Sequence, residues 1–329
     1  MLFENLTSLI DGELLNEPSI ASFTNIVFES KKVKRGDLYF GPVKGIDEAL
    51  KNGAYGIVST TSNIKDDEIA WIKIKNIKVA YLKLLRYLIL KDDSYVLYLD
   101  CIKSEILKNI TNAKEIFFID SDIQEAIKSL NSDKKYDLIV FEDKKVFDDL
   151  EIVSLEVEII NAIKIQKATN FLMTFIYKES LYKDIKLPAL FAKDLEFVLN
   201  LCDLLSFEYF VDKLTFLSHF KPVFLDSYFR VLPFGSSRKV IILENKKELL
   251  KREIEFIKSN SPWAKIALLL PKNIKYNEKI DIDIKYFKNF ADIKKENIFY
   301  YNFVIMLDTE SKFENYLQKY DNENKNKLF

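Results

Sequence analysis

The residue types that could carry chemistry are scarce in this sequence, and glycine is the scarcest of them in its middle. Of seven glycines in 329 residues, six fall at positions 12, 36, 41, 45, 53 and 56, and the seventh is Gly235. A loop that cradles a phosphate needs glycine, because its backbone must take positive φ angles and approach the anion closely. The sequence therefore excludes a glycine-rich phosphate loop between Thr60 and Arg230.

Residues that could act as nucleophiles or general bases are also few, and the sequence shows no partner beside them. His219 is the only histidine, between Ser218 and Phe220. A catalytic histidine usually needs a carboxylate to orient it, and no such partner can be identified in the sequence, which favours a partly buried structural role. Cys101 and Cys202 lie in apolar settings without an identifiable base, so small core residues are favoured over nucleophiles. We predict no catalytic residue among them.

Composition narrows the classes of function further. The chain carries 49 Lys and Arg against 50 Asp and Glu, a net charge of -1 that supplies no field to attract nucleic acid. One histidine and two cysteines leave almost no material for a zinc site or a disulfide framework. The N-terminus lacks a basic segment before its first acids, and the apolar run Val79–Leu90 is broken by Lys83 and Arg86. These observations predict a cytoplasmic protein with no nucleic-acid partner and no membrane span.

The elements that must position these residues follow an alternating pattern. Residues 25–59 predict strand, strand, helix and strand, residues 70–80 a further strand and residues 81–90 a helix. In a second unit the runs at 95–100, 115–120, 136–142 and 157–163 predict strands, and the segments 103–110 and 123–130 predict helices. This alternation predicts an α/β fold built from βαβ units with mostly parallel sheets.

The last part of the chain continues the α/β pattern. Residues 190–220 predict two helices, and a third unit has strands at 239–244, 265–271 and 300–308 with a helix over 246–260. We expect domains at 1–91, 92–237 and 238–329, the last ending in a disordered polar tail, DNENKNKLF. The aromatic residues between 207 and 229 could form a partner-binding surface, but core packing is favoured.

One N-terminal segment resembles a known family. The stretch FESKKVKRGDLYFGPVKGIDEALKNGAYGIVST is similar to the N-terminal domain of the Mur ligases, which add amino acids or dipeptides to UDP-N-acetylmuramic acid in bacterial cell-wall synthesis. Glu29-Ser30-Lys31 stands at the family's DSR-like triplet, Arg35–Tyr39 at its PGDLF element, and Lys44-Gly45 at its KG turn. The DGHDF stretch of the family is missing. The resemblance implies a three-domain α/β architecture in which this domain binds the uridine end of a nucleotide, with Ser30, Lys31, Lys44 and Gly45 as the candidate residues.

The nucleotide site of the family is present only as remnants. SYVLYLDCIKSEILKNI lies where the family has an ATP loop ending in GKT, so that Lys103-Ser104 falls at the Lys-Thr pair without the preceding glycines. Glu142 falls at the glutamate that helps to hold magnesium, and Glu244-Asn245 is what remains of an Asp-Asp and Asn-Pro motif. From the residues alone, Lys103 is more simply a solvated lysine opening a helix, Asp100 or Ser104 a helix cap, and Glu142 a solvated strand end.

The resemblance therefore implies a degenerate and shortened member of this family. We expect a non-catalytic binding or scaffold protein linked to peptidoglycan or cell-envelope assembly, with a uridine nucleotide or a protein as partner and no cofactor. The alternative is an active ATP-dependent UDP-N-acetylmuramoyl-peptide ligase that uses Mg-ATP at a diverged site; the missing glycine loop disfavours it. An enzyme of unrelated chemistry on the same fold is a third alternative that no residue cluster supports.

Overall fold

The structure is a computed structural model that describes residues 1–132, 134–309 and 311–326. The chain divides into two compact units. The first unit comprises residues 1–101 and 113–156, and the second comprises residues 102–112 and 157–329. This division is coarser than the three expected domains and cuts the middle one, whose boundaries stay predictions.

The first unit contains two sheets that share one hydrophobic core. A five-stranded sheet has the order β1-β5-β4-β3-β2, with β1 Glu13–Leu14, β2 Ile26–Val27, β3 Leu38–Phe40, β4 Gly56–Ser59 and β5 Ala70–Lys73. Its strands are parallel except for β1. A three-stranded parallel sheet has the order β6-β8-β7, with β6 Tyr95–Tyr98, β7 Ile116–Ile119 and β8 Leu138–Phe141.

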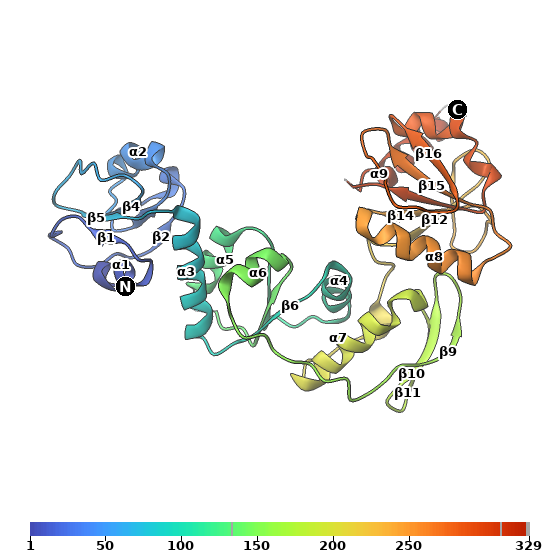
Figure 1. The fold of residues 1–329 in the computed structure, drawn as a ribbon, viewed down its shortest axis with the longest axis horizontal. Helices are drawn as coiled ribbons and strands as arrows, with labels where there is room; N and C mark the ends of the chain where they lie inside the picture. The colour runs from blue at the N-terminus through green and yellow to red at the C-terminus, as the bar shows by residue number, and fades with distance from the viewer. Residues whose placement is uncertain (133, 310, 327–329) are drawn as a thin grey trace. The chain divides into compact units, whose positions relative to one another are not determined.

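The helices of the first unit cover these sheets with their apolar faces. They are α1 Phe3–Leu9, α2 Ile46–Lys51, α3 Ile77–Lys91, α5 Ile123–Leu130 and α6 Lys144–Leu150. Helix α3 begins after Asn76, whose side chain accepts hydrogen bonds from the backbone N–H groups of Lys78 and Val79. It packs against α5 and α6 (Figure 1). Its buried Leu84 and Leu88 belong to a core cluster that runs from Phe3 to Leu150.

The second unit also contains two sheets. A three-stranded antiparallel sheet, β11-β10-β9, is formed by β9 Lys164–Ala168, β10 Met173–Tyr177 and β11 Ser180–Ile185. A six-stranded sheet has the order β13-β12-β14-β17-β15-β16, with β12 Lys221–Leu225, β13 Val231–Leu232, β14 Val240–Glu244, β15 Ile266–Pro271, β16 Asp283–Phe287 and β17 Phe303–Leu307. Strands β14, β15, β16 and β17 are parallel. The helices are α4 Cys101–Ile110, of which residues 102–110 lie in this unit, α7 Ala192–Leu204, α8 Leu250–Asn260 and α9 Phe313–Asn326 (Figure 1).

Most predicted elements are confirmed, and three differ. Residues 157–163 form no strand, because the backbone N–H groups of Ile160 and Asn161 bond to the Asn200 side chain instead of a neighbouring strand. Of the two helices predicted over 190–220 only α7 forms; the later part is irregular apart from a 3-10 turn at Val211–Lys213. The strand predicted over 70–80 ends at Lys73, since α3 begins at Ile77.

The aromatic residues between 207 and 229 pack mainly inward, as favoured from the sequence. Phe220, Phe224 and Phe229 are buried, while Tyr228 is 71% exposed. At the C-terminus α9 continues to Asn326, so the part of the expected disordered tail before residue 327 is helical, and the rest lies outside the described residues. No helix in the described parts of the chain has both the length and the apolar character needed to cross a bilayer.

Candidate functional site

The connection between β6 and α4 is where a phosphate-binding loop would have to lie. Strand β6 ends at Tyr98 and α4 begins at Cys101, so only Leu99 and Asp100 connect them. A phosphate cradle requires several consecutive backbone N–H groups that converge on one anion. Two connecting residues, one of which carries a carboxylate, do not provide such a cradle.

Lys103 is instead part of an ion cluster between helices of the second unit. Its Nζ lies 3.4 Å from Asp194 Oδ1 on α7, and Arg252 on α8 places a guanidinium nitrogen 3.3 Å from Oδ2 of the same carboxylate. Arg252 also donates a hydrogen bond to the carbonyl of Leu190. Asp194 is buried, and the Lys103 ammonium lies 5.6 Å from the centre of the Phe197 ring. The lysine therefore joins α4 to α7 rather than facing open solvent.

The two residues predicted beside it take different places. Ser104 is fully buried within α4, so it does not cap the helix; the position before Cys101 belongs to Asp100. Glu142 follows β8, and its backbone N–H donates to the carbonyl of Ile119. The next residue, Asp143, caps α6. Among the residues that the structure describes, no group of three His, Cys, Asp or Glu side chains could hold a metal ion. Glu142 belongs to the first unit and Lys103 to the second.

The structure brings two of the four candidate uridine-site residues together. Ser30 Oγ donates a 2.6 Å hydrogen bond to Glu48 Oε2, and an added Cβ on Gly45 would lie 3.1 Å from the Ser30 Cβ. The same Cβ would lie 2.2 Å from the hydroxyl of buried Tyr39, which donates to the carbonyl of Pro42. Gly45 is therefore required by close packing against Tyr39.

The other two candidates, Lys31 and Lys44, are exposed. Each lies in a short 3-10 helix, Ser30–Lys32 or Val43–Gly45. Burial raises the pKa of Tyr39, and nearby Glu48 raises it further, so the phenol stays a neutral hydrogen-bonding group. The two 3-10 helices thus present the Ser30 hydroxyl and three exposed ammonium groups, and Glu48 on α2 adds a carboxylate; such groups can recognise a nucleotide's polar atoms.

Sequence reasoning missed the partner of His219. Its Nδ1 lies 2.7 Å from Oε1 of Glu244, the last residue of β14, and both side chains are buried. Glu244 also accepts hydrogen bonds from the backbone N–H groups of Phe220, Asn245 and Lys246. Burial acts to raise the pKa of Glu244, but hydrogen bonds from the His219 and Glu253 side chains, with the charge of His219 and the backbone N–H of Lys246, hold it below its ordinary value. With 5% of His219 exposed, the pair lies in the interior and fixes the loop before β12.

The Glu244 motif offered the only sequence signal for this pair. Glu244-Asn245 matched the family's motif at the end of a strand, which marks the carboxyl edge of the six-stranded sheet. Ligands of open α/β sheets bind at that edge. A cavity of about 320 Å³ lies there, lined in part by Asn273, Lys288 and Asp308.

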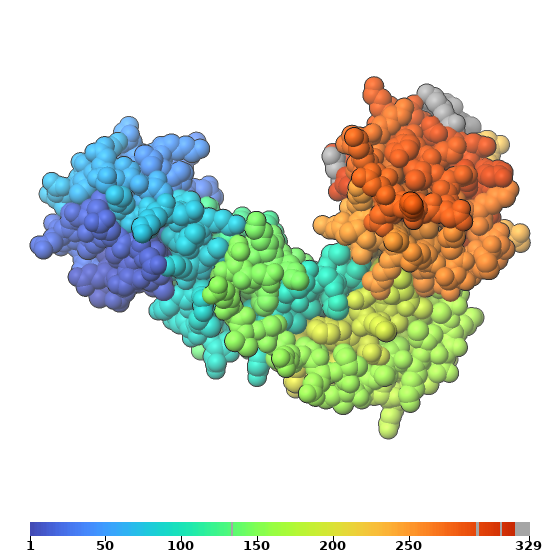
Figure 2. Space-filling view, in the orientation of Figure 1, coloured from blue at the N-terminus to red at the C-terminus, as the bar shows by residue number. Residues whose placement is uncertain are grey.

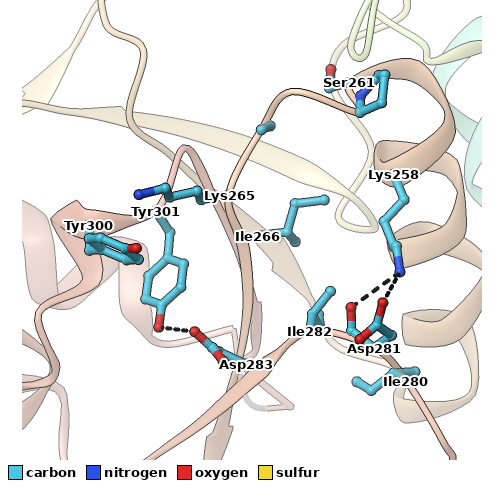
Figure 3. A pocket seen from close by; sticks show the side chains of 12 residues that line it. Lys258, Ser261, Lys265, Ile266, Ile280, Asp281, Ile282, Asp283, Tyr300 and Tyr301 are labelled. Atoms are coloured by element: carbon cyan, nitrogen blue, oxygen red, sulfur yellow. Dashed lines mark hydrogen bonds and ion pairs between the residues drawn. The ribbon is translucent and has the colours of Figure 1, made fainter.

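A larger cavity, of about 610 Å³, lies at the opposite edge of this sheet (Figure 3). It is bounded by residues just before or at the amino ends of β15, β16 and β17. Its polar groups pair with one another, since Lys258 bonds to Asp281, and Tyr301 donates a 2.6 Å bond to Asp283. That bond, with burial, raises the pKa of Tyr301 to about 12. Lys265, which also lines the cavity, places its Nζ 3.8 Å from the centre of the Tyr300 ring.

Comparison with solved structures identifies the fold. The chain is similar to the MurF ligase from Thermotoga maritima, solved in complex with ADP, with 14% identity, a TM-score of 0.60, and coverage of 92% of this chain and 98% of that one. It is also similar to the UDP-N-acetylmuramoylalanyl-D-glutamyl-2,6-diaminopimelate–D-alanyl-D-alanyl ligase from Acinetobacter baumannii, with 9% identity, a TM-score of 0.52, and coverage of 97% and 92%. No family model and no curated protein sequence matches the chain. The predicted Mur ligase-like α/β fold is thus confirmed.

Proposed function

We propose that this protein is a non-catalytic relative of the Mur ligases that acts as a binding or scaffold protein in peptidoglycan assembly. The observation that carries the proposal is the connection between β6 and α4, where two residues replace the phosphate loop and Lys103 is engaged by Asp194. The link to peptidoglycan rests on the similar structures, a MurF ligase and a UDP-N-acetylmuramoylalanyl-D-glutamyl-2,6-diaminopimelate–D-alanyl-D-alanyl ligase.

The chemistry of ligation explains why this connection matters. Transfer of a phosphoryl group from ATP to a carboxylate depends on positioning and on neutralising charge with backbone N–H groups, a lysine and magnesium. Asp100 brings a negative charge to the position where the triphosphate would bind; at 4 Å, like charges repel by about 1 kcal/mol even in water. These features disfavour the active ligase.

The N-terminal 3-10 helices are the part of the fold that supports a retained ligand. Ser30 keeps its hydroxyl at the matched triplet, and Gly45 keeps the turn beside it. Lys31 and Lys44 are exposed nearby and could meet a diphosphate. A uridine nucleotide bound there would serve as the ligand of a sensor or scaffold.

Thermal unfolding with single ligands tests the proposal. The purified protein is heated with Mg-ATP, with UDP, or with a UDP-N-acetylmuramoyl peptide. A ligand at about 100 times its Kd stabilises the folded protein by roughly 2.7 kcal/mol, which raises the midpoint of thermal unfolding by several degrees.

We expect the uridine compounds to raise this midpoint. The double variant Ser30→Ala with Lys44→Ala should lose the response, and the control variant Lys32→Ala should keep it. No shift with any ligand would remove the nucleotide from the proposal. A shift with Mg-ATP, together with ADP release, would overturn it in favour of the active ligase.

The variant Lys103→Ala distinguishes a structural role of this lysine from a role in binding Mg-ATP. Because the Asp194 carboxylate keeps Arg252, we expect a loss of about 1–2 kcal/mol in stability and unchanged ligand-induced shifts. Lys193→Ala, at an exposed position on α7, is the matched control and should lie within about 0.5 kcal/mol of the parent. If Lys103→Ala left stability unchanged but removed a response to Mg-ATP, the structural role would be wrong.

A further inference from the structure

The outer face of α3 bears a groove that the proposed function does not use. It has a volume of about 500 Å³ and is lined by residues of α1 and α3, all in the first unit: Leu9, Lys83, Arg86, Tyr87, Leu90 and Lys91. We call it the α1–α3 groove. The five α3 residues follow three- and four-residue spacing, so they share one side of the helix, opposite the side buried against the core. The space-filling view shows α3 at the surface of the first unit (Figure 2).

The groove combines apolar side chains with cations. Leu90 is 61% exposed and Tyr87 39% exposed, while Leu9 on α1 is half-buried. Neighbouring exposed apolar side chains on one helix face mark contact surfaces more often than isolated ones do. Among the described residues that line the groove, three carry a positive charge and none is acidic.

The cations of the groove form only exposed surface ion pairs with the carboxylates near them. Lys83 pairs with Asp11, and an Arg86 guanidinium nitrogen lies 3.8 Å from Glu151. The side chains of Asp11 and Glu151 are 74% and 83% exposed, and such surface pairs contribute about 0–1 kcal/mol each. A carboxylate from a partner that also excludes water from the groove can replace them.

We propose that the α1–α3 groove docks an acidic amphipathic helix of another protein. Leu or Phe residues at three- and four-residue spacing on that helix would contact Leu9, Tyr87 and Leu90, and its carboxylates would meet the cations along α3. An acidic partner is chosen because its carboxylates complement the positive charges of Lys83, Arg86 and Lys91. The inference does not depend on the nucleotide site.

An anionic membrane fits this surface less well. A second cavity shares Lys83 and Arg86 with the groove but is lined by Asp149 and Glu151 as well. A flat bilayer touching α3 would meet these acids together with the cations, whereas the charged side chains that line the α1–α3 groove are all cationic among the described residues.

Fluorescence anisotropy with designed peptides tests the proposal on the full chain. The probe is a labelled peptide of about 18 residues with Leu on one helical face and Glu elsewhere. The comparison peptides are a scrambled sequence of the same composition and a version with Lys in place of Glu. We expect the acidic amphipathic peptide to bind the parent protein. The double variant Lys83→Glu with Arg86→Glu should bind this peptide about tenfold or more weakly. The same double variant should bind the peptide that has Lys in place of Glu, because the charges are then complementary again.

The controls separate docking from a loss of fold. Leu90→Ala should weaken binding several-fold, whereas Val79→Ser, at an exposed position of α3 outside the groove, should not. Thermal midpoints of all variants should stay close to that of the parent. Equal binding of the scrambled peptide, insensitivity to the charge reversals, or no binding at about 1 mM would overturn the proposal. Binding of phosphatidylserine vesicles but not of the peptide, abolished by the same reversals, would overturn it in favour of a membrane surface.

Discussion

At the scale of single residues, one lysine shows how a motif position can change its use. A lysine that opens a helix after a strand can bind a phosphate only if the loop before it supplies N–H groups. Here the Asp194 carboxylate, and not a phosphate, is the anion that pairs with Lys103, and Arg252 pairs with the same carboxylate. Sequence alone placed Lys103 correctly at the start of a helix. It could not identify Asp194, which lies 91 positions later and is brought close only by tertiary packing of α7.

The Glu244–His219 pair predicts a pH dependence of stability. The folded-state pKa of Glu244 is lowered from its ordinary 4.5, so its contribution is present above that pH and is lost as the pH falls through the lowered value. Glu244→Gln should cost about 3 kcal/mol near pH 7, because the buried ring and backbone N–H groups lose their anion. The difference from the parent should shrink below about pH 4.

Denaturant unfolding followed by far-UV circular dichroism measures this difference in stability at each pH. Glu255→Gln, an exposed position on α8, is the control and should follow the parent at every pH. A gap between Glu244→Gln and the parent that stayed constant from pH 7 to pH 3 would show that the carboxylate charge contributes nothing.

At the scale of elements, the sequence predicts the buried parallel strands best. Continuous apolar runs such as YVLY and LIVF have few alternatives to a strand covered on both faces, and β6 and β8 form as predicted. Residues 157–163 are also rich in apolar side chains but form no strand, because the Asn200 amide and the Glu196 carboxylate on α7 accept their backbone N–H groups. The hairpin of β10 and β11 was not predicted, although Met173, Phe175 and Tyr177 alternate along β10 and are buried.

The Asn200 side chain holds residues 160 and 161 in place through hydrogen bonds to their backbone. Its buried amide accepts from the backbone N–H groups of Ile160 and Asn161, and donates to the carbonyl of Asn161. Asn200→Ala should cost about 2 kcal/mol and raise hydrogen exchange at residues 160 and 161, with α8 unaffected. Gln166→Ala, at an exposed position of β9, should change neither quantity. Unchanged exchange in Asn200→Ala would mean that the segment is held by other contacts.

At the scale of the whole molecule, the chain passes three times between its two compact units. Residues 102–112, most of α4, belong to the second unit, although the sequence on both sides of them belongs to the first. Polar contacts join this segment to the rest of the second unit. The backbone N–H of Phe210 donates to the carbonyl of Ile110, that of Ser218 donates to the Glu105 carboxylate, and Lys103 pairs with Asp194. The domain boundaries expected from composition do not anticipate this exchange, because nothing in the local pattern of α4 specifies which core it joins.

The second unit should therefore be incomplete as a continuous fragment. Residues 157–329 lack α4, so Asp194 loses Lys103 and Ser218 loses Glu105, and the fragment should unfold at a lower temperature than the same region of the full chain. Adding a peptide of residues 101–112 should raise the midpoint in a concentration-dependent way, because the peptide binds only the folded state. A peptide carrying Lys103→Glu should raise it less, since its carboxylate would repel that of Asp194. If the fragment alone matched the full chain, α4 would contribute nothing to the second unit, and a remnant of the nucleotide site would again be the simpler account of its sequence.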